Sequence, residues 1–296
     1  MHYASARMAA VRSNPAVALA PLACLLIAAC GQAKAQPNAL PGAVGSATLN
    51  LAVQTATPRA PLPSGGPEIA RVPAAPAAAE TACPDGMVLV DGEYCPDVEQ
   101  TCLRWMDPPG PYRNFRCAEY KHPAKCKTAR VHRRFCIDRT ERTEPGSDLP
   151  RHFMSWTSSK ALCEAEGGRL CKESEWIFAC EGEEMRPYPY GFKRDEGACN
   201  TDIQEGLGRI GRLVDHRAPA SAHPRCASPF GVLDLSGNVE EWTQADSPKY
   251  GYKEVMKGSW WIPSRHACRQ FQVGHDDHYN GAETGTRCCK DAAPAR

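Results

Sequence analysis

The sequence predicts an α+β fold that is irregular, rich in loops and cross-linked by disulfides. The chain has 296 residues and 16 cysteines, and fourteen of these cysteines lie between Cys83 and Cys289. The apolar runs in that region are short and are interrupted by Gly, Pro and Asp, which is typical of short strands joined by turns. Only two stretches carry the start and stop signals of helices. Together, these features favour an α+β architecture held by cross-links.

The first 29 residues are predicted to be a bacterial lipoprotein signal peptide. Arg7 and Arg12 precede an apolar run over 16–29 that is too short to span a bilayer. The run ends in the lipobox-like sequence IAAC, whose cysteine is Cys30. Lipidation of Cys30 would tether the chain to a membrane. The alternative is ordinary cleavage after Ala29, which would leave Cys30 as an odd thiol in an oxidising compartment.

Residues 30–82 are predicted to be the lipid anchor followed by a disordered linker. The segment is dominated by Ala, Pro, Gly and Val, and it has no aromatic residue. Such a composition cannot bury enough apolar surface to fold. The composition changes at Cys83, so a single domain is expected over 83–290, followed by a tail over 291–296.

Within the domain, strands are expected at 87–90 and 135–137, and helices at 156–166 and 174–180. The first helix is preceded by capping candidates and ends at Gly167 and Gly168, a common C-terminal signal. Four tryptophans are expected to pack in the core: Trp156, Trp176, Trp242 and Trp260.

The cysteine spacing and the charge balance exclude two classes of function. The sequence has no C-x-x-C pair and no zinc-finger spacing, so an even set of cysteines in an exported chain indicates disulfides rather than zinc. Lys and Arg number 35 against 34 Asp and Glu, and nucleic acid is therefore not an expected partner. The basic stretch at 121–134 is interpreted as a solvated surface.

Several segments, taken in order, resemble the formylglycine-generating enzyme or sulfatase-modifying factor family. They are 86–92 (GMVLVDG), 135–143 (FCIDRTERT), 154–156 (MSW), 168–170 (GRL), 173–176 (ESEW), 188–191 (YPYG), 230–242 (FGVLDLSGNVEEW), 257–260 (KGSW) and 285–288 (GTRC). The resemblance implies the C-type-lectin-like fold of that family. It also implies two disulfides, Cys163 with Cys288 and Cys180 with Cys268, so that Cys288 and Cys289 would have different partners.

The resemblance further implies two calcium sites on irregular loops, where oxygen ligands suit this ion. Asn238 and Glu241 match one site, and Asn200 with Asp215 matches the other. The alternative for the first site is that Asn238 caps a turn and Glu241 pairs with an arginine.

Active members of the family use copper(I) held by two cysteines, and soft thiolates are the ligands this ion prefers. The matching positions here are Ile262 and Ala267, so the copper site is expected to be absent. Ser259 and Cys268 remain as weak catalytic candidates, and a role for iron is left open. The cluster from His275 to His278 is a possible transition-metal site, although a polar surface loop is the favoured interpretation.

The sequence therefore favours a lipid-anchored, non-oxidase binding or structural module of the cell envelope, with calcium as a possible cofactor. It would lie at the outer membrane or the periplasmic face and bind an envelope protein or a glycan. The expected contact loops are 107–115, 187–194 and 275–284, because recognition residues concentrate on loops of rigid scaffolds. The alternative is a formylglycine-generating or related copper- or iron-dependent oxidase with a rebuilt site near Ser259, Cys268 and His275.

Overall fold

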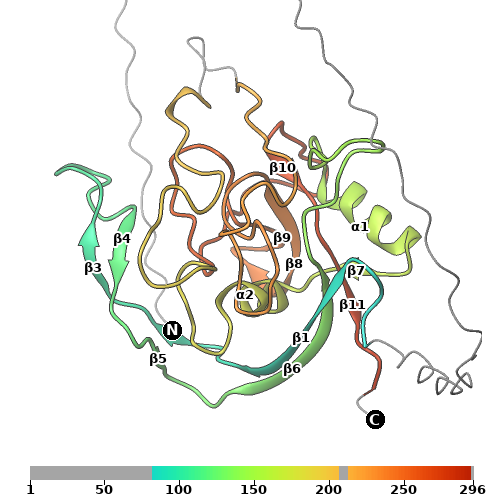
Figure 1. Ribbon diagram of the computed structural model, residues 1–296, viewed down its shortest axis with the longest axis horizontal. Coiled ribbons are helices and arrows are strands. Elements are labelled where there is room, and N and C mark those ends of the chain that lie inside the picture. The colour runs from blue at the N-terminus through green and yellow to red at the C-terminus, as the bar shows by residue number, and fades with distance from the viewer. Residues whose placement is uncertain (1–81, 207–212, 295–296) are drawn as a thin grey trace, which may run out of the picture. The chain divides into compact units, whose positions relative to one another are not determined.

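The computed structural model describes residues 82–206 and 213–294 (Figure 1). The predicted signal peptide at 1–29, the lipidation site Cys30 and the linker up to residue 81 lie outside the described residues. The domain combines short strands, two α-helices and long ordered loops, which confirms the predicted α+β class. No helix among the described residues is long and apolar enough to cross a membrane.

The central sheet brings the two ends of the domain together. Its order is β1 (Met87–Tyr94), β6 (Val131–Asp138), β11 (Cys288–Asp291) and β7 (Arg169–Leu170), and every neighbouring pair is antiparallel. Figure 1 shows β11, the red C-terminal strand, beside β6 and β7. The predicted strands at 87–90 and 135–137 lie within β1 and β6 and face each other in register. In β1 the more buried side chains alternate with more exposed ones, whereas β6 is buried at every position from Phe135 to Asp138.

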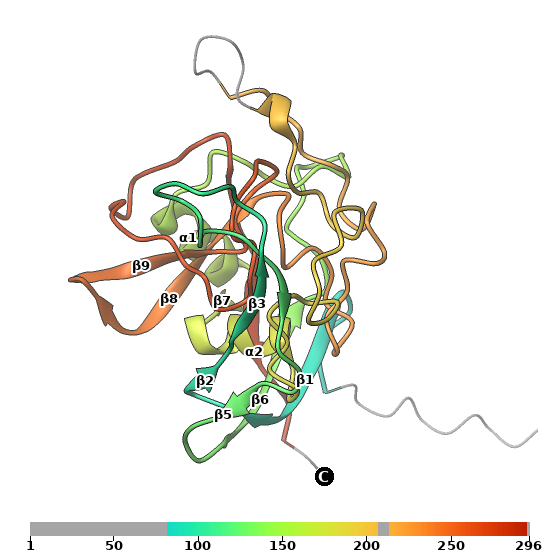
Figure 2. The same cartoon turned by 90° about the vertical axis from the view of Figure 1, so that its left-hand side faces the viewer.

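A second sheet has the order β10 (Thr284–Gly285), β8 (Glu240–Lys249) and β9 (Tyr252–Lys257), with β10 parallel to β8. In Figure 2 the β8–β9 hairpin extends away from the rest of the domain. Two small sheets pair β2 (Val98–Glu99) with β5 (Lys125–Cys126), and β3 (Cys102–Trp105) with β4 (Cys117–Tyr120). A single 3-10 turn, η1, covers Gln204–Gly206.

Helix α1 (Trp156–Ala165) starts and ends where the capping signals predict. Ser155 caps its N-terminus by accepting from the amide of Ser158, and the Ser158 hydroxyl satisfies the Ser155 amide in return. The chain leaves the helix through Gly167, whose φ of 71° is left-handed.

Helix α2 (Glu173–Glu181) is buried along its whole length and on all sides. It packs between the central sheet and the β8–β9 hairpin, so each face has a partner.

The core consists of two main clusters. One joins α2 to β1 and β6 through residues such as Trp176, Phe178 and Phe135. The other joins α1 to β8 and β9 through Trp156, Trp242 and Met256. The prediction that Trp260 is a core residue is corrected, because Trp260 is half-buried and its neighbour Trp261 is the fully buried ring. The chain direction after the turn at 258–259 decides which of the two rings points inward.

All fourteen cysteines from Cys83 to Cys289 form disulfides. The pairs are Cys83–Cys136, Cys95–Cys126, Cys102–Cys117, Cys163–Cys288, Cys171–Cys289, Cys180–Cys268 and Cys199–Cys226. They include both pairs that the family resemblance implies. Cys288 and Cys289 have separate partners, and together they tie β11 to α1 and to the start of α2. Seven disulfides place the folding of this domain outside the reducing cytoplasm.

The C-terminal end is more ordered than the predicted tail at 291–296. Asp291 is the last residue of β11, and its carboxylate accepts from Arg169 at 2.8 Å. The amide of Ala293 donates to the carbonyl of Ala82 at 3.0 Å. The ordered domain therefore extends beyond residue 290, because its last described residues bond to Arg169 and to Ala82.

We expect Gly237→Ala to destabilise the domain far more than Gly251→Ala. Both glycines have left-handed φ values, +83° and +89°, so both substitutions carry a backbone cost of about 1–2 kcal/mol. Only at Gly237 would the new Cβ meet another atom, the Asn200 carbonyl oxygen at 2.2 Å. We expect a total loss above about 3 kcal/mol for Gly237→Ala, measured by chemical denaturation with the disulfides intact. Equal losses in the two variants would contradict the close approach at Gly237.

Candidate functional site

The candidate site begins at the turn that follows β9. Gly258 and Ser259 have consecutive left-handed φ values of 87° and 60°. A serine in this conformation is strained, and such strain persists only where the surrounding structure imposes it. The Gly258 carbonyl accepts from the Gly237 amide at 2.9 Å, which joins the turn to the loop before β8. The side chain of Ser259 thereby borders a hollow in the surface.

This hollow has a volume of about 110 Å³. Its wall combines a carboxyl group, hydroxyl and amide side chains, and two phenylalanine rings. The lining residues are Phe115, Glu240, Gly258, Ser259, Ser264, Arg265, His266, Ala267, Gln270, Phe271 and Gln272. At the rim, Arg265 packs its guanidinium over the Phe115 ring, with 5.3 Å between the guanidinium carbon and the ring centroid. The site is thus small, mainly polar, and open at an aromatic edge.

Glu240 lies at the base of this hollow as the first residue of β8. Glu240 is 4% exposed, and no group in the described part of the chain forms a hydrogen bond with its buried Oε2. Burial, helped by the nearby Glu283 carboxylate and opposed by Lys257, raises the pKa of Glu240 to about 8. A buried polar atom without a partner costs free energy, so this carboxyl group requires an explanation. Sequence reasoning did not select it.

His266 holds the loop that forms the far wall. Its Nε2 lies 2.9 Å from the carbonyl oxygen of Ile262, and its Nδ1 lies 3.4 Å from that of Gly258. Burial lowers the pKa of His266 to about 4, so the ring is neutral near pH 7. His266 therefore positions the loop rather than supplying a charge.

The two weak catalytic candidates have different environments. Ser259 lines the hollow, as described above. Cys268 is fully buried and is bonded to Cys180, as the family resemblance implies, so it offers no thiolate for catalysis. Ala267 also lines the hollow, whereas Ile262 contributes its carbonyl to His266. The two positions that match the copper cysteines thus carry an alkyl group each.

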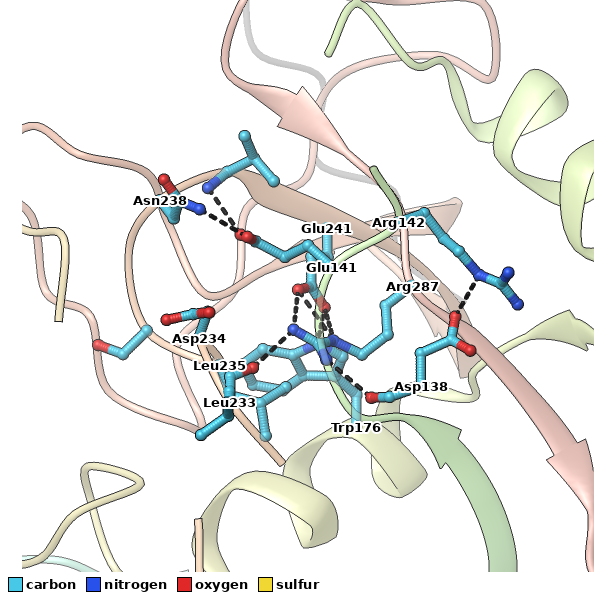
Figure 3. Close-up of polar contacts among 12 residues, drawn as sticks. Asp138, Glu141, Arg142, Trp176, Leu233, Asp234, Leu235, Asn238, Glu241 and Arg287 are labelled. Carbon is cyan, nitrogen blue, oxygen red and sulfur yellow. Dashed lines mark hydrogen bonds and ion pairs between the residues drawn. The ribbon is translucent and has the colours of Figure 1, made fainter. Parts of the chain in front are cut away.

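A buried polar network surrounds Arg287 (Figure 3). Arg287 is 1% exposed, and its guanidinium donates to both oxygens of Glu241 at 2.8–3.0 Å. The same guanidinium donates to the carbonyls of Asp138 and Leu233 at 2.8 Å each. Trp176 donates its indole N–H to Glu241 at 2.6 Å. Burial lowers the pKa of Arg287, and the Glu241 carboxylate more than offsets this, so Arg287 remains charged.

Asn238 is the second centre of this network. Its Oδ1 accepts from the side chain of Asn200 and from the amide of Ala218, each at 2.8 Å. Its Nδ2 donates to Glu141 at 2.6 Å. Burial raises the pKa of Glu141 well above its usual value, and the nearby carboxylates of Asp234 and Glu241 add to the effect. Asn238 thus binds a carboxyl group that is easily protonated.

The predicted calcium ligands fit the ion unequally. Both carboxylate oxygens of Glu241 accept hydrogen bonds from Arg287, so Glu241 does not fit as a calcium ligand. The alternative interpretation, in which Glu241 pairs with an arginine, is the one observed. Asn238 and Asn200, which were assigned to separate sites, bond to each other. Asp215 is bonded to the guanidinium of Arg217 at 2.9 Å. Calcium at Asn238, Asn200 and Asp215 stays a prediction, and binding would require these existing bonds to be exchanged.

The cluster at 275–278 is a surface loop. The ring of His275 stacks on that of Tyr279 with a centroid separation of 3.8 Å, and Asp276 caps the amides of His278 and Tyr279. Within 82–206 and 213–294, no group of three or more His, Cys, Asp or Glu side chains is arranged to hold a metal ion. His275 does lie near the hollow, since its Nε2 is 3.1 Å from the side-chain amide of Gln272.

Comparison with known proteins gives consistent results. The sequence profile described as "Sulfatase-modifying factor enzyme 1-like domain" matches residues 93–292. The Mus musculus protein named inactive C-alpha-formylglycine-generating enzyme 2 is 29% identical over 157 residues, which cover 49% of this chain and 50% of that protein. The Mus musculus formylglycine-generating enzyme is 24% identical over 201 residues, which cover 60% of this chain and 50% of that protein.

The chain therefore spans about half the length of these curated relatives. Among solved structures, the crystal structure of CarF aligns with a TM-score of 0.46 at 16% identity, covering 69% of this chain and 97% of that chain. The profile match confirms the family resemblance read from the ordered motifs.

We expect Arg287→Met to lower the free energy of unfolding by about 3–5 kcal/mol, because it leaves the buried Glu241 carboxylate without its partner. The double variant Arg287→Met/Glu241→Leu should recover part of this loss by removing the unpaired charge. Lys160→Met is the control, since Lys160 forms an exposed pair with Glu164 and such pairs contribute less than about 1 kcal/mol. Chemical denaturation measures all three variants. If Arg287→Met matched Lys160→Met, the buried pair would not have the structural role described here.

Proposed function

Because the chain belongs to the family of sulfatase-modifying factor enzyme 1-like domains, we propose that it is an exported, lipid-anchored binding module of the cell envelope without the copper-dependent oxidase activity. The proposal rests on one observation above the others. Every cysteine from Cys83 to Cys289 is bonded to another cysteine. The folded domain therefore has no thiolate pair with which to hold copper(I).

The residues at the matching positions support the same conclusion. Ile262 and Ala267 have no metal-binding atom in their side chains, and the adjacent Cys268 is fixed in a disulfide with Cys180. A relative named as an inactive formylglycine-generating enzyme shows similarity over half of this chain. Loss of the oxidase site with retention of the scaffold is thus a consistent explanation for the residues present.

Attachment to a membrane is proposed from the sequence IAAC ending at Cys30 and the apolar run before it. The seven disulfides support export, because such bonds form and persist in oxidising compartments. The Ala- and Pro-rich segment that follows Cys30 would separate the domain from the membrane surface.

A binding role is supported by the hairpin β3–β4. The hairpin exposes four large apolar side chains, Leu103, Trp105, Tyr112 and Phe115, of which Tyr112 is 72% exposed. The disulfide Cys102–Cys117 holds the two strands together at their base. The hairpin tip falls within the predicted contact loop 107–115. Exposed aromatic groups on a rigid support are typical of recognition surfaces, and a protein or glycan of the envelope is the partner we propose.

The alternative is a metal-dependent oxidase with a rebuilt site. It is favoured by similarity to the active Mus musculus formylglycine-generating enzyme and by Ser259, which lines the hollow. The disulfide between Cys268 and Cys180 argues against this alternative, because Cys268 then offers no thiolate to a metal ion. His275 alone could not replace the thiolate pair that holds copper(I).

We expect the purified, non-reduced domain to contain no alkylatable thiol and to bind no stoichiometric copper(I). Mass spectrometry after alkylation counts the thiols, and competition with a copper(I) chelator measures the metal. The variant Cys180→Ser provides the control, because it should release one thiol at Cys268. A wild-type protein with two free thiols and one bound copper(I) would restore the oxidase interpretation.

We expect Cys30→Ser to move the protein from the detergent phase to the aqueous phase in a phase-partition assay, because the acyl chains can no longer be attached. Mass spectrometry of the mature wild-type protein should show a lipidated N-terminal cysteine. Cys24→Ser is the matched control, since Cys24 lies inside the predicted signal peptide and should leave partitioning unchanged. Membrane attachment that persists in Cys30→Ser would contradict the anchor.

A further inference from the structure

The hollow beside Ser259 contains a carboxyl group that no neighbour satisfies. Glu240 is buried at its base, and its Oε2 has no hydrogen-bond donor among the described residues. The neighbouring Ser259 and Gln270 add a hydroxyl and an amide to the wall, both of which can accept hydrogen bonds. The hollow thus combines several acceptors around one carboxyl group in a space of about 110 Å³.

The charges around Glu240 leave it without a counter-ion. Glu283 is a second carboxylate on the adjoining chain segment, and it is bonded to the neutral hydroxyl of Tyr279 at 2.6 Å. The amide of Glu240 donates to the carbonyl of Glu283, which keeps the two segments together. Lys257 is fully buried, burial lowers its pKa to about 7, and its Nζ lies 3.6 Å from Glu173. No ion pair therefore neutralises Glu240 within the described residues.

The remaining groups of the wall do not change this balance. His266 is neutral and has a single ring N–H, which donates to a backbone carbonyl, that of Ile262 being the nearer at 2.9 Å. Arg265 lies at the exposed rim and packs on Phe115. His275 faces Gln272 outside the hollow. Burial keeps the Glu240 carboxyl group largely protonated near pH 7, and a positive charge bound beside it would favour its ionised form.

We propose that this hollow binds the primary ammonium group of an amine ligand, with the Glu240 carboxylate as its counter-ion. An ammonium has three N–H donors and a compact charge, which matches a carboxylate surrounded by hydroxyl and amide oxygens. The rings of Phe115 and Phe271 give the attached methylene groups an apolar contact at the opening. The inference rests on the proposed binding function and specifies the chemistry of its ligand.

The backbone supports the view that the hollow is a built site. Ser259 and His266 both have left-handed φ values, 60° and 53°, although neither is glycine. Two strained residues on one wall indicate that the surrounding structure holds this shape against a conformational cost. The alkyl side chain of Ala267 leaves space on the wall that a larger residue would fill.

The experiment measures binding of small amines to the full disulfide-bonded domain by titration calorimetry or NMR. Nα-acetyl-lysine methylamide represents a lysine side chain, glycinamide represents a chain N-terminus, and putrescine represents a free amine. The Nε-acetylated form of the first probe has the same arm without the charge. We expect saturable binding with 1:1 stoichiometry by at least one amine, and we expect the acetylated probe not to bind.

The variant Glu240→Gln keeps the shape of the side chain and removes its charge. We expect it to weaken amine binding by about tenfold or more, because hydrogen bonds to a charged group are the stronger kind. Glu99→Gln removes a charge from an exposed position of β2 and should leave affinity unchanged. If Glu240→Gln does not fold, Glu240→Asp retains the charge on a shorter arm and should still bind, with lower affinity.

Equal binding by wild type and Glu240→Gln, or binding of the acetylated probe with the same affinity, would overturn the inference. Absence of saturable binding by all three amines would also overturn it. Failure here is distinct from failure of the proposed function, which is decided by the thiol count and copper(I) competition. A domain that binds neither amines nor copper(I) would remain a non-oxidase module whose hollow has another role.

Discussion

The buried ion pair between Arg287 and Glu241 connects the parts of this domain that are distant in sequence. Glu241 lies in β8, Arg287 directly precedes β11, and the guanidinium also bonds to carbonyls at Asp138 and Leu233. Burying two charges is costly unless each remaining donor and acceptor is satisfied. Here Trp176 supplies a further donor to Glu241, so α2 also depends on the pair. The two sheets, the central helix and one long loop are therefore positioned around a single guanidinium.

The disulfides act on the same region by a different physical effect. Cys288 and Cys289 follow Arg287 immediately and are bonded to Cys163 and Cys171. Cross-links of this kind mainly restrict the unfolded chain, whereas the ion pair specifies the folded arrangement. A domain with short strands and many loops has few regular hydrogen-bonded segments, so both effects are needed to hold β11 in register between β6 and β7.

The sequence predicted those features that depend on local signals. Helix α1 was correct to within one residue because Ser155 and Gly167 act on adjacent backbone groups. Strands β1 and β6 were found from their apolar runs. The full burial of α2 and the choice between Trp260 and Trp261 depend on tertiary neighbours, which a local pattern does not contain. Counting cysteines could not determine their pairing, and only the family resemblance implied two of the seven pairs.

The candidate site was predicted in position but not in composition. The motif around Ser259 and the positions of Ile262 and Ala267 correctly indicated the turn that borders the hollow. The sequence did not indicate that Glu240 also lines it. A glutamate at the start of a strand is ordinarily solvated. Where two glutamates are adjacent, the sequence does not indicate which of them forms a buried ion pair. The fold separates them, because successive side chains of a strand point to opposite faces. Glu241 turns toward Arg287, and Glu240 turns toward the hollow.

This alternation explains how a new site could arise without loss of the scaffold. The face of β8 that carries Glu241 belongs to the buried network, while the face that carries Glu240 belongs to a surface hollow bordered by Ala267 and Ser259. The disulfide Cys180–Cys268 lies next to Ala267 and fixes the loop from within. The hairpin β3–β4 adds Phe115 at the opening and exposes Tyr112 nearby in sequence. A ligand bound at Glu240 would therefore lie close to the exposed hairpin proposed as the recognition surface, and the disulfides Cys180–Cys268 and Cys102–Cys117 hold these two parts of the fold.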